Sequence, residues 1–272
     1  MENMPTKNKI EIQPKGSYFQ TDENGFLINP ASVEKVQEKW KPLIDDIVEA
    51  YKNKYGEKLK NVFIRGSVAK GEAVEGVSDI DTFAYVDLSK EELKDNNTNR
   101  DIRKHIEEKY DFVEDIEMGA FPLSDIPDDH IILNQSLCVY GEPISIPKLK
   151  VGKEMAIHSP TFHNRFKWFE KFLEKDESEE EIKKSCVWLM KGLLRVGFEL
   201  TMERSQKYTR DLYRCYETFS EYYPEKEPEM REVLDLALNP IADKQKMKEI
   251  MDSLGAWLLA EIPNHFEIKQ DK

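Results

Sequence analysis

The chain has 272 residues and a mass of 31.9 kDa, enough for one large domain or two ordinary ones. Its 40 Lys and Arg residues against 53 Asp and Glu residues give a formal net charge of −13. This charge argues against binding a long nucleic acid and favours a cationic partner or substrate. No apolar run approaches the roughly 20 residues that cross a bilayer, and residues 1–16 lack the apolar core of a secretory signal, so we expect no membrane association.

The cysteine and histidine patterns exclude several common kinds of site. The three cysteines are Cys138, Cys186 and Cys215, and they form no CxxC pair, so we expect neither a disulfide framework nor a structural zinc site. A reducing cytoplasm is the expected compartment. The histidines form no HExxH motif, and the chain has neither a GxSxG motif nor a Walker loop.

The first regular element is predicted after an irregular lead-in over residues 1–30. Apolar residues recur at helical spacing over residues 33–51, which predicts a helix. Ser32 is the expected N-cap and Gly56 the expected end. Pro42 either kinks this helix or marks its true first turn.

The following segment has the short apolar runs that are typical of strands. Strands are predicted at residues 61–67, 77–87 and 111–121, with a short helical turn between the first two. A loop and a polar helix fit residues 89–110. Residues 130–141 fit either a helix or a strand.

Beyond about residue 155 only helical patterns occur. Helices are predicted at residues 160–173, 182–204, 212–223, 228–238 and 244–262. Thr209 or Asp211 could cap the third of them. Trp168, Trp188 and Trp257 lie on helix stripes and are predicted to belong to the core. The expected fold class is α+β, with a mixed sheet and flanking helices in residues 1–155 and an all-helical bundle in residues 156–272.

The residues with the clearest chemistry are Gly66, Ser67, Asp79 and Asp81. Alternate residues of a strand point to the same face, so the two carboxylates would lie about 7 Å apart at Cα and could hold one hard cation such as Mg²⁺. The Gly-Ser turn offers backbone N–H groups and a hydroxyl to a phosphate. Each feature alone is common in turns and on solvated strands, but their order along the chain is specific.

That order resembles the DNA-polymerase-β-like nucleotidyltransferase superfamily. Its pattern is a Gly-Ser turn, a spacer and an acidic pair on a strand. Here Gly66 and Ser67 form the turn, eleven residues follow, and Asp79 and Asp81 form the pair. The pattern covers about a quarter of the chain and does not specify the acceptor.

The resemblance implies a third carboxylate on a neighbouring strand. Glu117 lies between two apolar residues and fits best, with Glu114 and Asp115 as alternatives. The resemblance also implies two Mg²⁺ ions held by Asp79 and Asp81, attack of an acceptor hydroxyl on the α-phosphorus, and loss of pyrophosphate. Glu117 would then be either a third metal ligand or the general base on the acceptor.

The two-domain layout is similar to that of the aminoglycoside adenylyltransferases of the streptomycin/spectinomycin type. This likeness implies that residues 1–155 are the nucleotidyltransferase domain and that residues 156–272 bind substrate or nucleotide. It also implies ATP as the donor of AMP, a cationic small-molecule acceptor such as an aminoglycoside, and a role in antibiotic resistance. No drug-binding motif in the helical half matches residue by residue.

Two other functions stay open. The first is a nucleotidyltransferase that acts on RNA or on a protein, as antitoxin-type enzymes do, although the acidic charge counts against RNA. The second is a nucleotide-binding relative without activity, although the intact acidic residues count against it. The chain is expected to be a monomer or a homodimer.

Binding a triphosphate also calls for cations. Lys70 follows the Gly-Ser turn, and Lys207 and Arg210 lie in a junction between helices, where such groups are often found. All three are candidate phosphate ligands, with ordinary surface charge as the alternative. Arg195 lies within the most hydrophobic helix and is expected either to reach solvent or to pair with Glu199.

Overall fold

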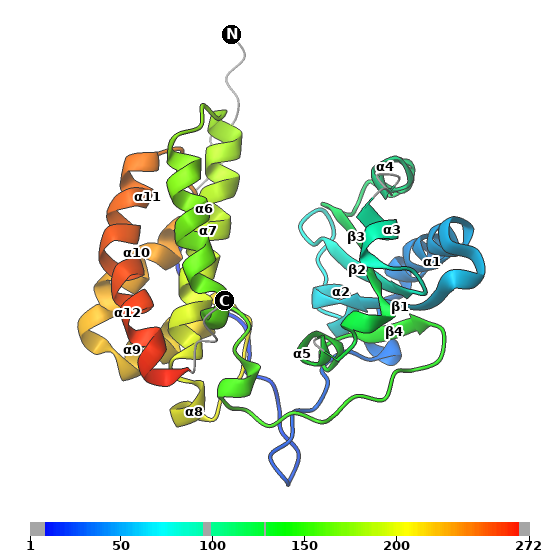
Figure 1. Ribbon diagram of the computed structural model, residues 1–272, viewed down its shortest axis with the longest axis horizontal. Coiled ribbons are helices and arrows are strands. Elements are labelled where there is room, and N and C mark those ends of the chain that lie inside the picture. Colours follow the sequence, from blue (N-terminus) through cyan, green and yellow to red (C-terminus); the bar gives the residue numbers. More distant parts are fainter. Residues whose placement is uncertain (1–8, 95–98, 128, 267–272) are drawn as a thin grey trace. The chain divides into compact units, whose positions relative to one another are not determined.

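The computed structural model describes residues 9–94, 99–127 and 129–266 and divides into two compact units (Figure 1). The sheet unit comprises residues 20–150. The helical unit comprises residues 151–272 together with the N-terminal segment up to Phe19. The predicted division near residue 155 differs from this one in the N-terminal segment, whose described residues bond to the helical unit.

A four-stranded sheet forms the centre of the sheet unit, and its mixed character was predicted. Its strands are β1 (Leu59–Arg65), β2 (Ile80–Val86), β3 (Ile116–Pro122) and β4 (Leu137–Tyr140), in the order β3-β2-β1-β4. β1 is antiparallel to β2 and β4, whereas β2 and β3 are parallel. The helices of this unit are α1 (Lys41–Tyr55), α2 (Gly66–Lys70), α3 (Lys90–Lys94), α4 (Asn99–Lys109) and α5 (His130–Leu133). Residues 130–141, which fitted a helix or a strand, contain both.

The first predicted helix begins later than expected. Residues Val33–Lys35 and Glu38–Trp40 form separate 3₁₀ turns, and α1 starts at Lys41 with Pro42 in its first turn. Proline lacks an N–H and is tolerated there, so the alternative that Pro42 marks the true first turn is confirmed. Gly56 ends the helix with a φ of 53°.

The two faces of the sheet are covered differently. One face packs against α1 and α4 in the main core, which includes Trp40, Leu43, Ile47, Tyr51, Val62, Ile64, Ile80, Ala84, Ile106 and Ile116. The other face carries a smaller cluster around Phe63, Phe83, Tyr85 and Leu133. Alternation along β2 puts Asp81 on this second face, with Phe83 and Tyr85.

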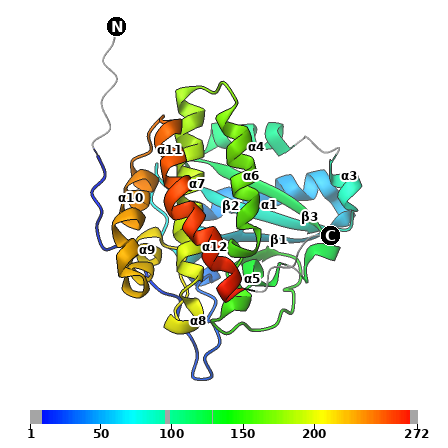
Figure 2. The same ribbon diagram turned by 60° about the vertical axis from the view of Figure 1, so that its left-hand side comes forward.

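The helical unit is built around α7. Its helices are α6 (Phe162–Leu173), α7 (Glu179–Glu199), α8 (Met202–Ser205), α9 (Leu212–Tyr222), α10 (Glu227–Leu238), α11 (Lys244–Ile250) and α12 (Ala256–His265), with a π-helical turn at Met251–Gly255 between the last two (Figure 2). A capping box between Ser178 and Glu181 starts α7, and Glu179–Glu181 form its first turn. At Gly197 a Cβ would lie 2.5 Å from Met230 and 2.9 Å from Phe219, so glycine permits the close packing of α7.

One predicted core residue lies at the surface. Trp188 is 42% exposed, and the Arg165 guanidinium carbon lies over its ring, 3.9 Å from the centroid. Trp168 packs beside it with 4.6 Å between ring centroids. Cys138, Cys186 and Cys215 are free thiols. No helix within the described ranges is long and apolar enough to cross a membrane.

Candidate active site

The acidic pair lies at the beginning of β2. Asp81 is the second residue of the strand, and Asp79 is exposed and directly precedes it, so only one of the two lies within the strand. Gly66 begins α2 immediately after β1. The sheet unit therefore brings the Gly-Ser turn and Asp81 together, because β1 and β2 are neighbours.

Three charged residues lie opposite one another across neighbouring strands. Arg65 of β1 pairs with Asp81 of β2, and Asp81 pairs with Glu117 of β3. Directly opposed residues project from the same face of a sheet, so these side chains form a row. Arg65 Nε lies 3.6 Å from Asp81 Oδ2. Sequence reasoning missed Arg65, because its place opposite Asp81 depends on the register between β1 and β2.

The row has the electrostatics of a cation site. The pKa of Glu117 is raised, first by a hydrogen bond with the Asp81 carboxyl, then by burial and by the charges of Asp81 and Asp79, while Arg65 opposes the rise. Two carboxyl groups in contact share a proton unless a cation balances them. Their oxygens are the ligands that Mg²⁺ prefers, so the donor set fits that ion. Among the described residues, no three His, Cys, Asp or Glu side chains are already arranged around a common point for a metal.

The competing acids are placed elsewhere. Asp115 Oδ1 lies 2.7 Å from Arg103 Nη2 in an ion pair, and Glu114 lies before β3 begins. Neither is opposite Asp81 in the strand register, whereas Glu117 is. The geometry therefore favours Glu117 as the third carboxylate.

The Gly-Ser turn depends on its glycine. Gly66 has a φ of 76°, and a Cβ there would lie 3.2 Å from Asp81 Oδ2. Both facts favour glycine, because the backbone must adopt a left-handed conformation and approach the carboxylate closely. Ser67 follows in the first turn of α2 and is partly exposed, and Lys70 ends the helix with its Nζ 3.1 Å from Glu72.

The two other candidate phosphate ligands belong to the helical unit, in the loop between α8 and α9. Lys207 Nζ lies 3.6 Å from a Glu221 carboxylate oxygen and 5.1 Å from the centroid of the Tyr18 ring. Arg210 lines a small pocket of the same unit. The pocket is formed by Ile157, His158, Arg195, Phe198, Glu199, Tyr208, Thr209 and Arg210.

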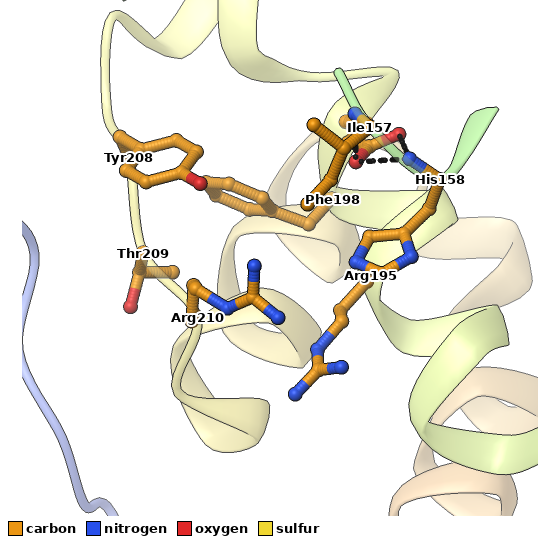
Figure 3. Close-up of a pocket in the computed structure, with 8 residues that line it drawn as sticks. Ile157, His158, Arg195, Phe198, Tyr208, Thr209 and Arg210 are labelled. Atoms are coloured by element: carbon orange, nitrogen blue, oxygen red, sulfur yellow. Dashed lines mark hydrogen bonds between the residues drawn. The ribbon is translucent and has the colours of Figure 1, made fainter. Parts of the chain in front are cut away.

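This pocket is rich in positive charge that has little compensation. In Figure 3 the guanidinium groups of Arg195 and Arg210 extend into the same space, with the His158 ring beside Arg195. Within the described structure, Arg195 Nε and His158 Nε2 are buried without a hydrogen-bond partner. Burial, followed by the charge of Arg210, lowers the pKa of Arg195 to about 10. Buried donors without partners are costly, which makes this pocket a favourable place for an anion.

Arg195 has neither of its two expected arrangements. Its side chain is largely enclosed in the pocket, and the carboxylate of Glu199 is engaged elsewhere. The Glu199 oxygens accept hydrogen bonds from the backbone N–H groups of Ile157 at 3.0 Å, His158 at 3.0 Å and Ser159 at 2.7 Å, and from Ser159 Oγ at 2.6 Å. Burial raises the pKa of this carboxyl, against the effect of those bonds. Glu199 thus anchors the chain before α6 and fixes the backbone of His158.

His158 makes the stability of the helical unit sensitive to acid. Burial, and then repulsion by Arg195, Arg210 and Arg165, lowers its pKa from 6.5 to about 3. The unfolded chain therefore binds a proton below pH 6.5 that the folded chain accepts only near pH 3, so stability falls as the pH is lowered through this window. The slope from one such group is at most about 1.4 kcal/mol per pH unit.

We expect the His158→Gln variant to lose less stability than the wild type between pH 6.5 and pH 4.5, in denaturant titrations at each pH. A matched variant, His105→Gln, removes an exposed histidine and should follow the wild-type curve. Equal pH slopes for all three proteins would show that His158 is not held neutral by the fold.

Comparison with known proteins identifies the sheet unit. Residues 43–133 match the family model described as a nucleotidyltransferase domain. The chain carries a nucleotidyltransferase domain. The match runs from α1 to α5 and includes the Gly-Ser turn, the acidic pair and Glu117.

No curated protein matches the chain. Among solved structures, the spectinomycin adenyltransferase AAD(9) from Enterococcus faecialis, determined with ATP and spectinomycin, is similar at 13% identity and a TM-score of 0.49. That alignment covers 82% of this chain and 99% of the other.

Proposed function

We propose that this protein transfers a nucleoside monophosphate, AMP from ATP, to a hydroxyl group of a small molecule and releases pyrophosphate. The observation that carries the proposal is the pairing of Asp81 with Glu117 across β2 and β3, next to the turn at Gly66. This arrangement lies inside a nucleotidyltransferase domain, where two acidic side chains on adjacent strands have an evident use.

Asp79 and Asp81 would hold Mg²⁺. When bound there, Mg²⁺ would neutralise phosphate charge and polarise the α-phosphate, which is the usual contribution of this ion to phosphoryl chemistry. The contact between the Asp81 and Glu117 carboxyls supports the assignment, because a cation relieves the repulsion that otherwise raises the pKa of Glu117.

The chain itself would contribute positioning and proton transfer. Arg65 holds its guanidinium beside Asp81 and limits the negative charge of the row. Glu117 is placed to accept a proton from the acceptor hydroxyl or to serve as a further metal ligand. The N–H groups and hydroxyl of Gly66 and Ser67 would bind a phosphate, with Lys70 as a nearby cation.

Cations of the helical unit are further candidates for binding phosphate. Lys207 and Arg210 are proposed for this role, and Arg195 joins them because it lines the same pocket as Arg210 and has an unpartnered donor within the described structure. A guanidinium binds phosphate oxygens through a planar pair of N–H donors, so two arginines can hold more than one phosphate oxygen each.

The acceptor is proposed to be cationic, as an aminoglycoside is. The net charge of −13 favours the approach of a polycation, and the family resemblance of the domain arrangement favours a drug-like acceptor. Modification of such a compound would give antibiotic resistance. The three free thiols are compatible with the cytoplasm, where ATP and Mg²⁺ are both present.

The test is pyrophosphate release from ATP and Mg²⁺ with aminoglycosides and related compounds added one at a time. We expect release to depend on one class of acceptor and to vanish in the Asp81→Asn variant. If ATP binds but no compound gives release, the small cationic acceptor is wrong, and RNA and proteins are the next acceptors to test. If ATP does not bind, the proposed function as a whole is wrong.

A further inference from the structure

We propose that the N-terminal segment Lys9–Phe19 is a positioning strap for the loop Lys207–Asp211 of the helical unit. Its last residues hold this loop in the conformation that presents Lys207 and Arg210 to the phosphates of a nucleotide. The inference rests on the proposed function for its ligand, but the strap itself is defined by contacts within one unit.

The last residues of the strap, Ser17–Phe19, are bonded to the loop. Phe19 N–H donates to the Tyr208 carbonyl at 2.8 Å, and the Thr209 hydroxyl donates to the Ser17 carbonyl at 2.7 Å. Ser17 N–H donates to Asp211 Oδ2 at 2.8 Å. The ring of Phe19 meets that of Tyr208 edge-on, with centroids 5.1 Å apart. These contacts reach three residues of the loop: Tyr208 through its carbonyl and its ring, Thr209 through its hydroxyl, and Asp211 through its carboxylate.

Two side chains expected to cap α9 serve the strap instead. Asp211 occupies the N-cap position, yet its carboxylate makes no capping bond to the helix and accepts from Ser17. Thr209 uses its hydroxyl to donate to the strap and to accept from the Asp211 N–H at 3.1 Å. A capping bond normally stabilises a helix by about 1 kcal/mol. Because these two side chains bond to the strap in place of α9, we infer a different role for them.

The residue that leads into the loop has an unfavourable backbone conformation. Gln206, which precedes Lys207, has a φ of 53°, in the left-handed region that costs energy for a residue other than glycine. The strap requires glycine at position 16, because φ there is 87° and a Cβ would overlap the Asp211 side chain. Arg214 Nε also donates to the Gly16 carbonyl at 3.0 Å. The strap therefore contacts a loop whose entry, at Gln206, requires a left-handed backbone.

Tyr18 links the strap to one of the cations directly. Its ring lies 5.1 Å from Lys207 Nζ, and its hydroxyl bonds to Glu217 at 3.0 Å and Thr218 at 2.8 Å. The hydroxyl bonds fix the ring, and the ring limits where the lysine ammonium can lie. The strap thus orients both a cation and the backbone that carries the other.

The far end of the strap provides a built-in control. Ile10 exchanges two hydrogen bonds with the Asn239 side chain at 2.7 Å and 2.9 Å, and Lys9 pairs with Asp235 at 2.9 Å. Both partners are on or next to α10, outside the Lys207–Asp211 loop. Loosening this end should lower stability without changing the loop.

The experiment measures the dissociation constant of Mg·ATP by calorimetry for four full-length proteins. Asp211→Ala removes the acceptor for Ser17, and Asp211→Asn keeps an acceptor oxygen while losing the same charge. Electrostatics alone predicts tighter phosphate binding in both variants. The strap predicts binding weaker by about tenfold in Asp211→Ala only, as for the loss of one hydrogen bond to a charged group. Asn239→Ala should bind as the wild type does.

Equal affinities for Asp211→Ala and Asp211→Asn would overturn the strap. If the wild type binds no Mg·ATP, the proposed function fails instead, and amide hydrogen exchange over residues 207–211 then decides the strap alone. Faster exchange in Asp211→Ala than in Asp211→Asn supports it, and equal exchange in the two variants overturns it.

Discussion

Replacing Asp81 with Asn is expected to reduce nucleotidyl transfer by about 10³-fold, as for the loss of roughly 4 kcal/mol of charge stabilisation at a metal site. The side chain is partly exposed at the start of β2, and its neighbours Ile80 and Thr82 carry the packing of the strand. The fold should therefore survive the change. Initial rates at saturating ATP, together with thermal unfolding, measure both effects.

The matched control for this prediction is Asp87→Asn. Asp87 directly follows the same strand and is exposed, and its salt-bridge partner among the described residues is Lys60 at 4.0 Å. The Asp87→Asn variant removes the same charge outside the row of Arg65, Asp81 and Glu117, so it should retain wild-type transfer. Full activity in both Asp79→Asn and Asp81→Asn would contradict the assignment of this pair.

Replacing Glu117 with Gln is the second change with a large expected effect. The carboxylate pairs with Asp81 in the strand register and has a raised pKa, and general acid–base catalysis by such a group contributes about 10²- to 10⁴-fold. We expect a loss of transfer in this range. Mg·ATP binding then separates the two roles, because a general base is dispensable for binding and a metal ligand is not.

Glu114→Gln is the control, since it makes the same chemical change three residues earlier and outside β3. It should retain transfer and binding. Activity that survives in Glu117→Gln and is lost in Glu114→Gln would mean that the third carboxylate had been chosen wrongly.

Much of the sheet unit could be predicted because its signals are local. Alternating apolar residues predict the strands, and the order of the Gly-Ser turn, Asp79 and Asp81 indicates the nucleotidyltransferase domain. The position of Glu117 followed from its apolar neighbours. By contrast, the start of α1 stayed open between Ser32 and Pro42, because the apolar spacing continues through two 3₁₀ turns that periodicity does not distinguish from α-helix.

Features that depend on distant contacts were out of reach. No sequence pattern around Arg65 indicates a role for it, and its place opposite Asp81 follows from the strand register. Arg195 and Glu199 look like a helical i,i+4 pair, but Glu199 bonds to residues 157–159, some forty positions earlier. The attachment of Lys9–Phe19 to the helical unit likewise joins residues about 200 positions apart.

The central claim is that the α-phosphate of ATP, with its nucleoside, moves to the acceptor. The most direct measurement incubates the protein, Mg²⁺ and the acceptor found by the pyrophosphate assay with ATP labelled at either the α- or the γ-phosphate, and analyses the acceptor by mass spectrometry. The account predicts an acceptor that is heavier by one AMP and carries label from the α position only. An acceptor that is heavier by one phosphate and labelled from the γ position would make the protein a phosphotransferase and contradict the account.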